Sequence, residues 1–190
     1  MTSDELTVLV EAHLVSALGH DSGRASVSFL GTDRIDVLRF GPDQDGLVRY
    51  ATVGMSRAPM SGSSELLTEG PRAELVLSVR GAHDTVLRRI GALAASPAVE
   101  GVVITPGAGL DLGEPLWDGG RFTAVLVGEP GGLVPDLAHD GDDVQFLPLL
   151  PMTANEAAWK RVHGATALEE RWLAQGTDLR DPLRAEVDLA

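Results

Sequence analysis

The histidines are the side chains of this sequence best suited to metal binding and acid–base catalysis. Five occur, at His13, His20, His83, His139 and His163. Histidines that share a metal site on one element recur at short spacings such as HExxH, because residues four apart lie on one helix face. No two of these histidines have such a spacing, and cysteine is absent. The sequence therefore predicts no metal centre and no resident cofactor.

Motifs for nucleophilic catalysis and phosphate binding are also missing. No GxSxG elbow occurs, and Ser61, Ser63 and Ser64 lie in a stretch rich in serine and glycine, which positions a nucleophile poorly. Gly107-Ala108-Gly109 begins like a dinucleotide-binding GxGxxG motif, but Leu112 occupies the place of the third glycine. We therefore predict that the chain is not an enzyme.

Acidic residues give two weak indications of ion binding. The stretch DQDG (43–46) opens like a calcium loop, but the later acid and the flanking helices of an EF-hand are missing. Asp140, Asp142 and Asp143 could hold a cation, although a solvated acidic loop is the favoured interpretation. Glu74 lies in an apolar strand, so we expect it to be partly buried and paired with Arg72 or another cation.

A few side chains could contact another protein. Trp117 stands out in a glycine-rich stretch of a chain with few aromatics, and could anchor an interface or fold inward over a core edge. Met55 and Met60 could offer an adaptable apolar surface, although burial is the commoner outcome for methionine. The predicted partner-binding residues are Met55, Met60, Trp117, Asp118, Asp140, Asp142 and Asp143.

The charge of the chain limits its partners. A formal net charge of -13 repels nucleic-acid phosphates and anionic membranes, so we expect neither as a partner. It would attract a basic protein, or it could serve solubility alone. No apolar run approaches the ~20 residues of a membrane span, and the start TSDE (2–5) has no basic region of a signal peptide. We expect a soluble, cytoplasmic protein.

The spacing of apolar residues predicts several helices. One covers residues 4–18 with a capping box between Thr2 and Glu5, and another covers 84–95 and ends before Pro97. A capping box between Thr153 and Glu156 begins a third, with Trp159 and Val162 facing inward. A short fourth helix follows Gly164 and pairs Leu168 with Trp172 at i, i+4 spacing.

Strands are expected over residues 26–30, 34–40, 47–54, 73–79, 102–105, 122–127 and 144–150, with a turn at 20–24. The early strands follow one another and the later ones alternate with helices. This order predicts an α+β fold, with a mixed, largely antiparallel sheet and helices packed on its faces. We expect a single domain over 1–175 and a loosely ordered C-terminal tail over 176–190.

Short motifs along the chain resemble those of a known family. They are YATVGMS (50–56) with its Gly-x-Ser end, RAELVL (72–77), Leu93-Ala94 in a helix, FTAVLV (122–127), and a C-terminal set of PLLPMT (148–153), Glu156 and His163-Gly164. In this order they resemble the Suppressor of fused-like domain family, in a bacterial single-domain form. The sequence departs from the family at Gly107-Ala108-Gly109, where members often carry Gly-His-Thr, and the first ~45 residues match poorly.

The resemblance implies an α/β sandwich that binds proteins and has no established chemistry. Animal members restrain transcription factors but carry a further C-terminal domain, so we do not transfer that activity. Many bacterial members are similar to immunity proteins that neutralise toxins. The leading hypothesis is therefore a non-catalytic protein-binding domain of the immunity type, whose partner is a basic toxin.

Two other hypotheses remain open. A small-molecule-binding protein or an enzyme would need Glu74, His163 and the loop 106–120 to line one cleft. A self-associating structural protein would need a surface that pairs with a second copy. The sequence does not fix the oligomeric state.

Overall fold

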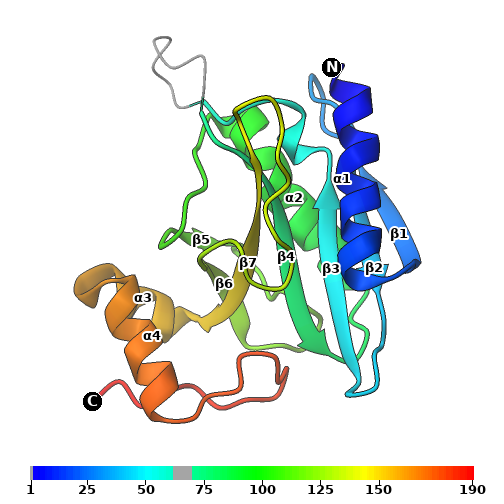
Figure 1. The fold of residues 1–190 in the computed structure, drawn as a ribbon. Coiled ribbons are helices and arrows are strands. Elements are labelled where there is room, and N and C mark those ends of the chain that lie inside the picture. Colours follow the sequence, from blue (N-terminus) through cyan, green and yellow to red (C-terminus); the bar gives the residue numbers. More distant parts are fainter. Residues whose placement is uncertain (1, 62–69) are drawn as a thin grey trace.

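A computed structural model describes residues 2–61 and 70–190, and in it the strands form a seven-stranded sheet in the order β1-β2-β3-β4-β7-β6-β5 (Figure 1). Neighbouring strands are antiparallel except β4 and β7, which are parallel. The predicted α+β fold with a mixed, largely antiparallel sheet is confirmed. The strands are β1 (Asp21–Val27), β2 (Ile35–Phe40), β3 (Leu47–Val53), β4 (Arg72–Arg80), β5 (Gly109–Asp111), β6 (Phe122–Val127) and β7 (Val144–Thr153).

Helices cover both faces of the sheet (Figure 1). Because side chains of a strand alternate between faces, Val37 of β2 packs with Ile90 on one side while Leu38 packs with Val10 on the other. The first side carries α2 (Thr85–Glu100), and the second carries α1 (Ser3–Leu18) at one end and α3 (Ala154–His163) with α4 (Ala165–Ala174) at the other. A 3-10 turn, η1 (Met55–Arg57), follows β3. Among the described residues, no helix combines the length and apolarity needed to cross a bilayer.

The two predicted capping boxes are present. In α1 the Glu5 amide donates to the Thr2 hydroxyl, and the Thr2 amide donates to the Glu5 carboxylate. Thr153 and Glu156 make the same exchange at the start of α3. Leu168 and Trp172 are both buried, as their spacing predicts. Trp159 packs partly buried against the same cluster, as predicted, but Val162 is 80% exposed, and Glu156 and Ala157 complete the inward face of α3.

The prediction that Pro97 ends the second helix is wrong, because α2 continues to Glu100. A proline inside a helix removes the hydrogen bond to the carbonyl four residues earlier, here that of Leu93. The hydroxyl of Ser96 donates to this same carbonyl at 2.7 Å. The Ser96 hydroxyl thereby replaces the hydrogen-bond donor that Pro97 lacks. The helix is capped at Gly101, which has the left-handed conformation that glycine favours.

Two strand predictions also need correction. Residues 21–24, expected as a turn, begin β1, and the strand ends at Val27, because the segment pairs with β2 from Asp21 opposite Phe40 to Val27 opposite Ile35. Residues 102–105 are not a strand. The Ile104 amide there donates to the Met60 sulfur at 3.3 Å and not to a neighbouring strand. An apolar run alone is therefore not enough to form a strand.

The segment after α4 differs from the loosely ordered tail expected over 176–190. Arg184 is buried and forms an ion pair with Glu156 at 2.8 Å, and Val187 joins the core beneath α3 and α4. Farther back, the Arg80 amide donates to the Arg180 carbonyl at 2.9 Å. These contacts depend on residues far apart in sequence, which is why turn-forming composition did not reveal them.

Candidate functional site

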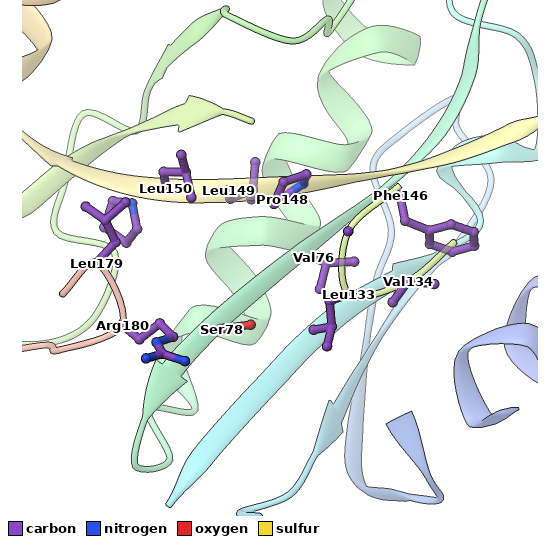
Figure 2. A pocket seen from close by; sticks show the side chains of 12 residues that line it. Val76, Ser78, Leu133, Val134, Phe146, Pro148, Leu149, Leu150, Leu179 and Arg180 are labelled. Carbon is purple, nitrogen blue, oxygen red and sulfur yellow. The ribbon is translucent and has the colours of Figure 1, made fainter. Parts of the chain in front are cut away.

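The candidate site is an apolar groove on the sheet face opposite α2. At one end of this face α1 packs on β2 and β3, and at the other α3 and α4 pack on β6 and β7. Between them lies a hollow of about 200 Å³, whose lining includes Val76, Phe146, Pro148 and Leu150 from the sheet (Figure 2). We call it the sheet groove. Its strand residues are apolar except Ser78.

The groove begins where β4 and β7 separate. Their parallel pairing runs from Arg72 opposite Val144 to Val76 opposite Pro148 and then ends, although both strands continue. Pro148 and Pro151 have no backbone N–H, so β7 has lost two donors along this stretch. Proline in an apolar strand is the sequence signal that could have indicated this opening.

The loop 128–143 forms one side of the groove through Leu133 and Val134. His13 of α1 holds this loop, because its Nε2–H donates to the Pro135 carbonyl at 2.7 Å while its ring stacks on Phe146 at 5.3 Å. At the far side of the loop, Arg72 forms an ion pair with Asp142 at 2.8 Å. Although the loop is held at both places, the side chain of Leu133 remains half exposed.

The C-terminal segment closes the opposite end, where Leu179 and Arg180 lie away from Phe146 (Figure 2). Arg80 of β4 holds this wall: its guanidinium pairs with Asp178 at 2.7 Å, and its amide donates to Arg180. The hydrogen bond from Arg80 lowers the pKa of Asp178 to about 2. Asp178 also accepts from Arg180 at 3.3 Å, so the groove's own cation already has an acidic partner.

A buried ion pair anchors the same segment farther along. Arg184 donates to both carboxylate oxygens of Glu156 at 2.8 Å, and its guanidinium lies 4.7 Å from the centre of the Phe122 ring. The Val187 amide also donates to Glu156 at 3.0 Å. Burial by itself would raise the pKa of Glu156, but these hydrogen bonds outweigh it and hold the pKa below its ordinary value.

Glu74 is fully buried, and its predicted pairing with a cation is wrong. Its carboxylate accepts hydrogen bonds from the Thr52 hydroxyl (2.7 Å), the Gly54 amide (2.9 Å), and the amide and hydroxyl of Ser56 (3.0 and 2.6 Å). Arg72 instead donates to the carbonyls of Ser56 and Arg57 and to Asp142. Burial raises the pKa of Glu74, and these hydrogen bonds offset only part of the rise. The Gly-x-Ser and Arg-x-Glu motifs thus fold onto each other.

The predicted partner-binding residues do not gather into one patch. Met55, Met60 and Trp117 are only 7%, 3% and 4% exposed, and Trp117 stacks on His83 at 5.2 Å and leans on Phe122. These three side chains are therefore buried, which was the alternative to a role in binding a partner. Asp118, Asp140 and Asp143 are exposed, and Asp142 pairs with Arg72. The Asp140 to Asp143 stretch lies in the same loop as Leu133 of the sheet groove.

The cleft that a catalytic function would need is not formed as expected. Glu74 has no exposed surface, whereas His163 is exposed at the end of α3 and stacks on Trp159 at 4.0 Å. In residues 2–61 and 70–190, no group of three or more His, Asp or Glu side chains is arranged to hold a metal ion. The sheet groove is a concave feature of the described chain, and its apolar walls suit binding.

Comparison with known proteins identifies the fold. The family model described as Suppressor of fused protein (SUFU) matches residues 31–185. A putative SUFU homologue from Neisseria gonorrhoeae superposes with a TM-score of 0.73 at 19% identity, covering 97% of each chain. A chain of a Sufu-Fu complex gives a TM-score of 0.68 at 14% identity, covering 95% of this chain and 91% of the other.

Drosophila Suppressor of Fused gives a TM-score of 0.64 at 13% identity. The match covers 94% of this chain but only 50% of the Drosophila chain, so this chain spans about half of that protein. A search of the curated proteins finds no match. At these identities the solved structures establish a shared fold, and the family model extends that likeness to the sequence.

Proposed function

Since the chain belongs to the Suppressor of fused protein family, we propose that it is a non-catalytic protein-binding domain that takes its partner at the sheet groove. One protein of the same fold is found in a Sufu-Fu complex, which supports a role in binding another protein. The observation that carries the proposal is the apolar hollow between α1 and the C-terminal segment, where Leu133 is half exposed and Pro148, Leu150 and Leu179 are partly exposed. Apolar surface gathered in a concave site and bordered by polar residues is typical of a binding surface.

The charge of the chain favours a basic partner. The net charge is -13, and the exposed Asp140 and Asp143 lie in the loop that carries Leu133 into the groove. A field of this sign raises the rate at which a basic protein arrives, while the apolar floor supplies contact area once it has docked. The finer proposal is an immunity-type role, in which the partner is a basic toxin that the chain neutralises.

The test is affinity capture from the native host at about 0.15 M salt, where charges more than about 8 Å apart are largely screened. We expect one basic protein to be enriched. Leu133→Asp should reduce its recovery at least about tenfold, because a charge would enter the apolar contact. Leu30→Asp, a leucine-to-aspartate change in the exposed loop between β1 and β2, should leave recovery unchanged.

The immunity role has a separate readout. Expressing the captured protein alone should arrest growth, and co-expression with the wild-type chain, but not with Leu133→Asp, should restore it. A captured protein that both variants retain equally would remove the sheet groove from the proposal. If no host protein is enriched under several growth conditions, protein binding itself is contradicted.

A further inference from the structure

A second hollow adjoins the sheet groove beside α4. It is lined by Leu150, Trp172, Leu173 and Leu179, with Glu169 and Glu170 at its margin. Leu150 and Leu179 line both hollows, so the two are adjacent. Together they form one feature, the long groove, that runs from Phe146 along β7 to the surface of α4.

The charges of the long groove change along its length. The end at Phe146 and Pro148 is apolar, whereas Glu169 and Glu170 are exposed at the end beside α4. Among the described residues, neither glutamate lies within 4.0 Å of a cationic side chain's nitrogen. Arg180, which lies between the two ends, is paired with Asp178. The α4 end therefore presents two acids that are not paired with any cation in the described part of the chain.

The dimensions favour an extended occupant. The sheet groove has a volume of about 200 Å³. A cavity of about 150 Å³ holds a molecule the size of benzene. The sheet groove therefore has room for one or two apolar side chains but not for a helix about 10–12 Å across. Phe146, Pro148 and Leu150 are alternate residues of β7 and so lie about 6.6 Å apart on one face. An extended chain repeats its side chains at the same interval.

We propose that the long groove binds an extended segment of a protein partner, with apolar side chains at alternate positions followed by lysine or arginine. The apolar side chains would lie over Pro148, Leu150 and Leu179, which are partly exposed, and the cations would reach Glu169 and Glu170. The segment is held by side-chain contacts, because Pro148 and Pro151 of β7 have no backbone N–H to donate and the Arg80 amide of β4 already donates to Arg180. This inference rests on the proposed function and defines what the partner presents.

The experiment uses labelled synthetic peptides and the full chain, with binding followed by fluorescence polarisation. The test peptide has three leucines at alternate positions, serines between them, and two arginines at one end. It is made with the arginines at either terminus, since the groove does not fix the direction of the segment. One control peptide replaces the arginines by glutamates, and a second replaces the leucines by serines.

The wild-type chain should bind one arginine peptide saturably, and both control peptides at least about fivefold more weakly. The glutamate peptide loses exposed ion pairs of about 1 kcal/mol each, and the serine peptide loses apolar burial of about 1.5 kcal/mol or more for each leucine. The double variant E169K/E170K should prefer the glutamate peptide, a reversal that a merely structural role of these residues would not produce. Both glutamates are exposed, so the variant should fold, which its circular dichroism checks.

Absence of saturable binding up to about 1 mM, a free energy of only about 4 kcal/mol, would overturn the inference. An equal affinity for the arginine and glutamate peptides would do the same. The proposed function fails separately. If the peptides do not bind but Leu133→Asp still abolishes capture of a host protein, the chain binds proteins in another way. If the peptides bind as expected and no host protein is captured, the groove stands without the function.

Discussion

Two fully buried carboxylates, Glu74 and Glu156, are held in opposite ways. Glu74 of β4 accepts from neutral donors contributed by Thr52, Gly54 and Ser56, and no cation contacts it in the described part of the chain. Glu156 of α3 is paired with Arg184, which comes from the C-terminal segment. Burial raises the pKa of the first, whereas the guanidinium and the backbone amides bring the pKa of the second below its ordinary value.

The difference shows what each carboxylate does for the fold. Glu74 joins β4 to the turn η1 that follows β3, so it closes a unit within the sheet. Glu156 joins the start of α3 to a segment 28 residues later, and that segment carries the wall of the long groove. Uncharged hydrogen-bond donors are enough to join two neighbouring elements, whereas an ion pair can fix the position of a distant segment.

The largest expected effect comes from removing the cation. Arg184→Met should lower the free energy of unfolding by about 3–5 kcal/mol, because Glu156 would remain buried without its partner charge. Urea denaturation measures this. Adding Glu156→Gln should recover part of the loss by removing the unpaired charge. Arg161→Met, at an exposed site on α3, is the matched control, and an equal cost for the two arginine variants would contradict the comparison.

Removing the carboxylate of Glu74, which only uncharged groups contact, should lower the free energy of unfolding by somewhat less. Glu74→Ala should lower the free energy of unfolding by at least about 2 kcal/mol, since it leaves two backbone amides and two hydroxyls buried without their acceptor. Glu74→Gln should cost less, because its oxygen can accept from Gly54 and Ser56 while its amide donates to the Thr52 hydroxyl. If Gln proved as damaging as Ala, the negative charge would matter more than the hydrogen bonds.

The pH dependence of stability should have opposite signs at the two sites. The folded pKa of Glu74 lies above 4.5, so the folded protein binds this proton more tightly and loses stability as pH rises from about 4.5 through the folded pKa. The folded pKa of Glu156 lies below 4.5, so its stabilisation is present above pH 4.5 and is lost as pH falls through the folded pKa.

Urea denaturation between pH 4 and 7 separates the two contributions. The stability of Glu74→Gln relative to the wild type should increase with pH, because the variant lacks the group whose ionisation is costly. A relative stability that falls with pH would mean that the carboxylate of Glu74 is ionised more readily in the folded chain than in the unfolded one.

The smallest effect on the free energy of unfolding is expected at the capping box of α1, which contains no buried charge. Thr2→Ala should lower the free energy of unfolding by about 1 kcal/mol. Thr153→Ala should cost more, because Thr153 is buried and its hydroxyl also donates to Glu186 of the C-terminal segment. Thermal unfolding of the two variants compares them. Equal losses would show that the capping box of α3 gains nothing from its junction with that segment.

Local patterns in the sequence predicted the parts of the fold that local geometry controls. Strand β6 and both capping boxes lie where the patterns place them, and Ile35 and Leu38 face opposite sides of the sheet as alternation requires. The prediction that Pro97 ends a helix failed because the Ser96 hydroxyl occupies the carbonyl that the proline leaves free. That interaction is also local, because it joins residues three positions apart.

The candidate site was not predictable in the same way. Residue type alone points to Met55, Met60 and Trp117, but whether such a side chain is an anchor or part of the core depends on what packs over it. All three are buried. The groove depends on where β4 and β7 separate and on a C-terminal segment that closes one end. Neither is a property of any short stretch of sequence.

The amino-acid sequence by itself determined the helix starts, the alternation that gives each strand two faces, the strongly acidic charge and the likeness to the Suppressor of fused family. These follow from hydrogen bonds and side-chain directions that repeat within a few residues. Tertiary structure alone decided that Glu74 is held without a cation, that Arg184 reaches Glu156, and that an apolar hollow lies between α1 and α4. The physical reason is that each of these depends on which distant segments meet, and that is settled by the order of strands in the sheet.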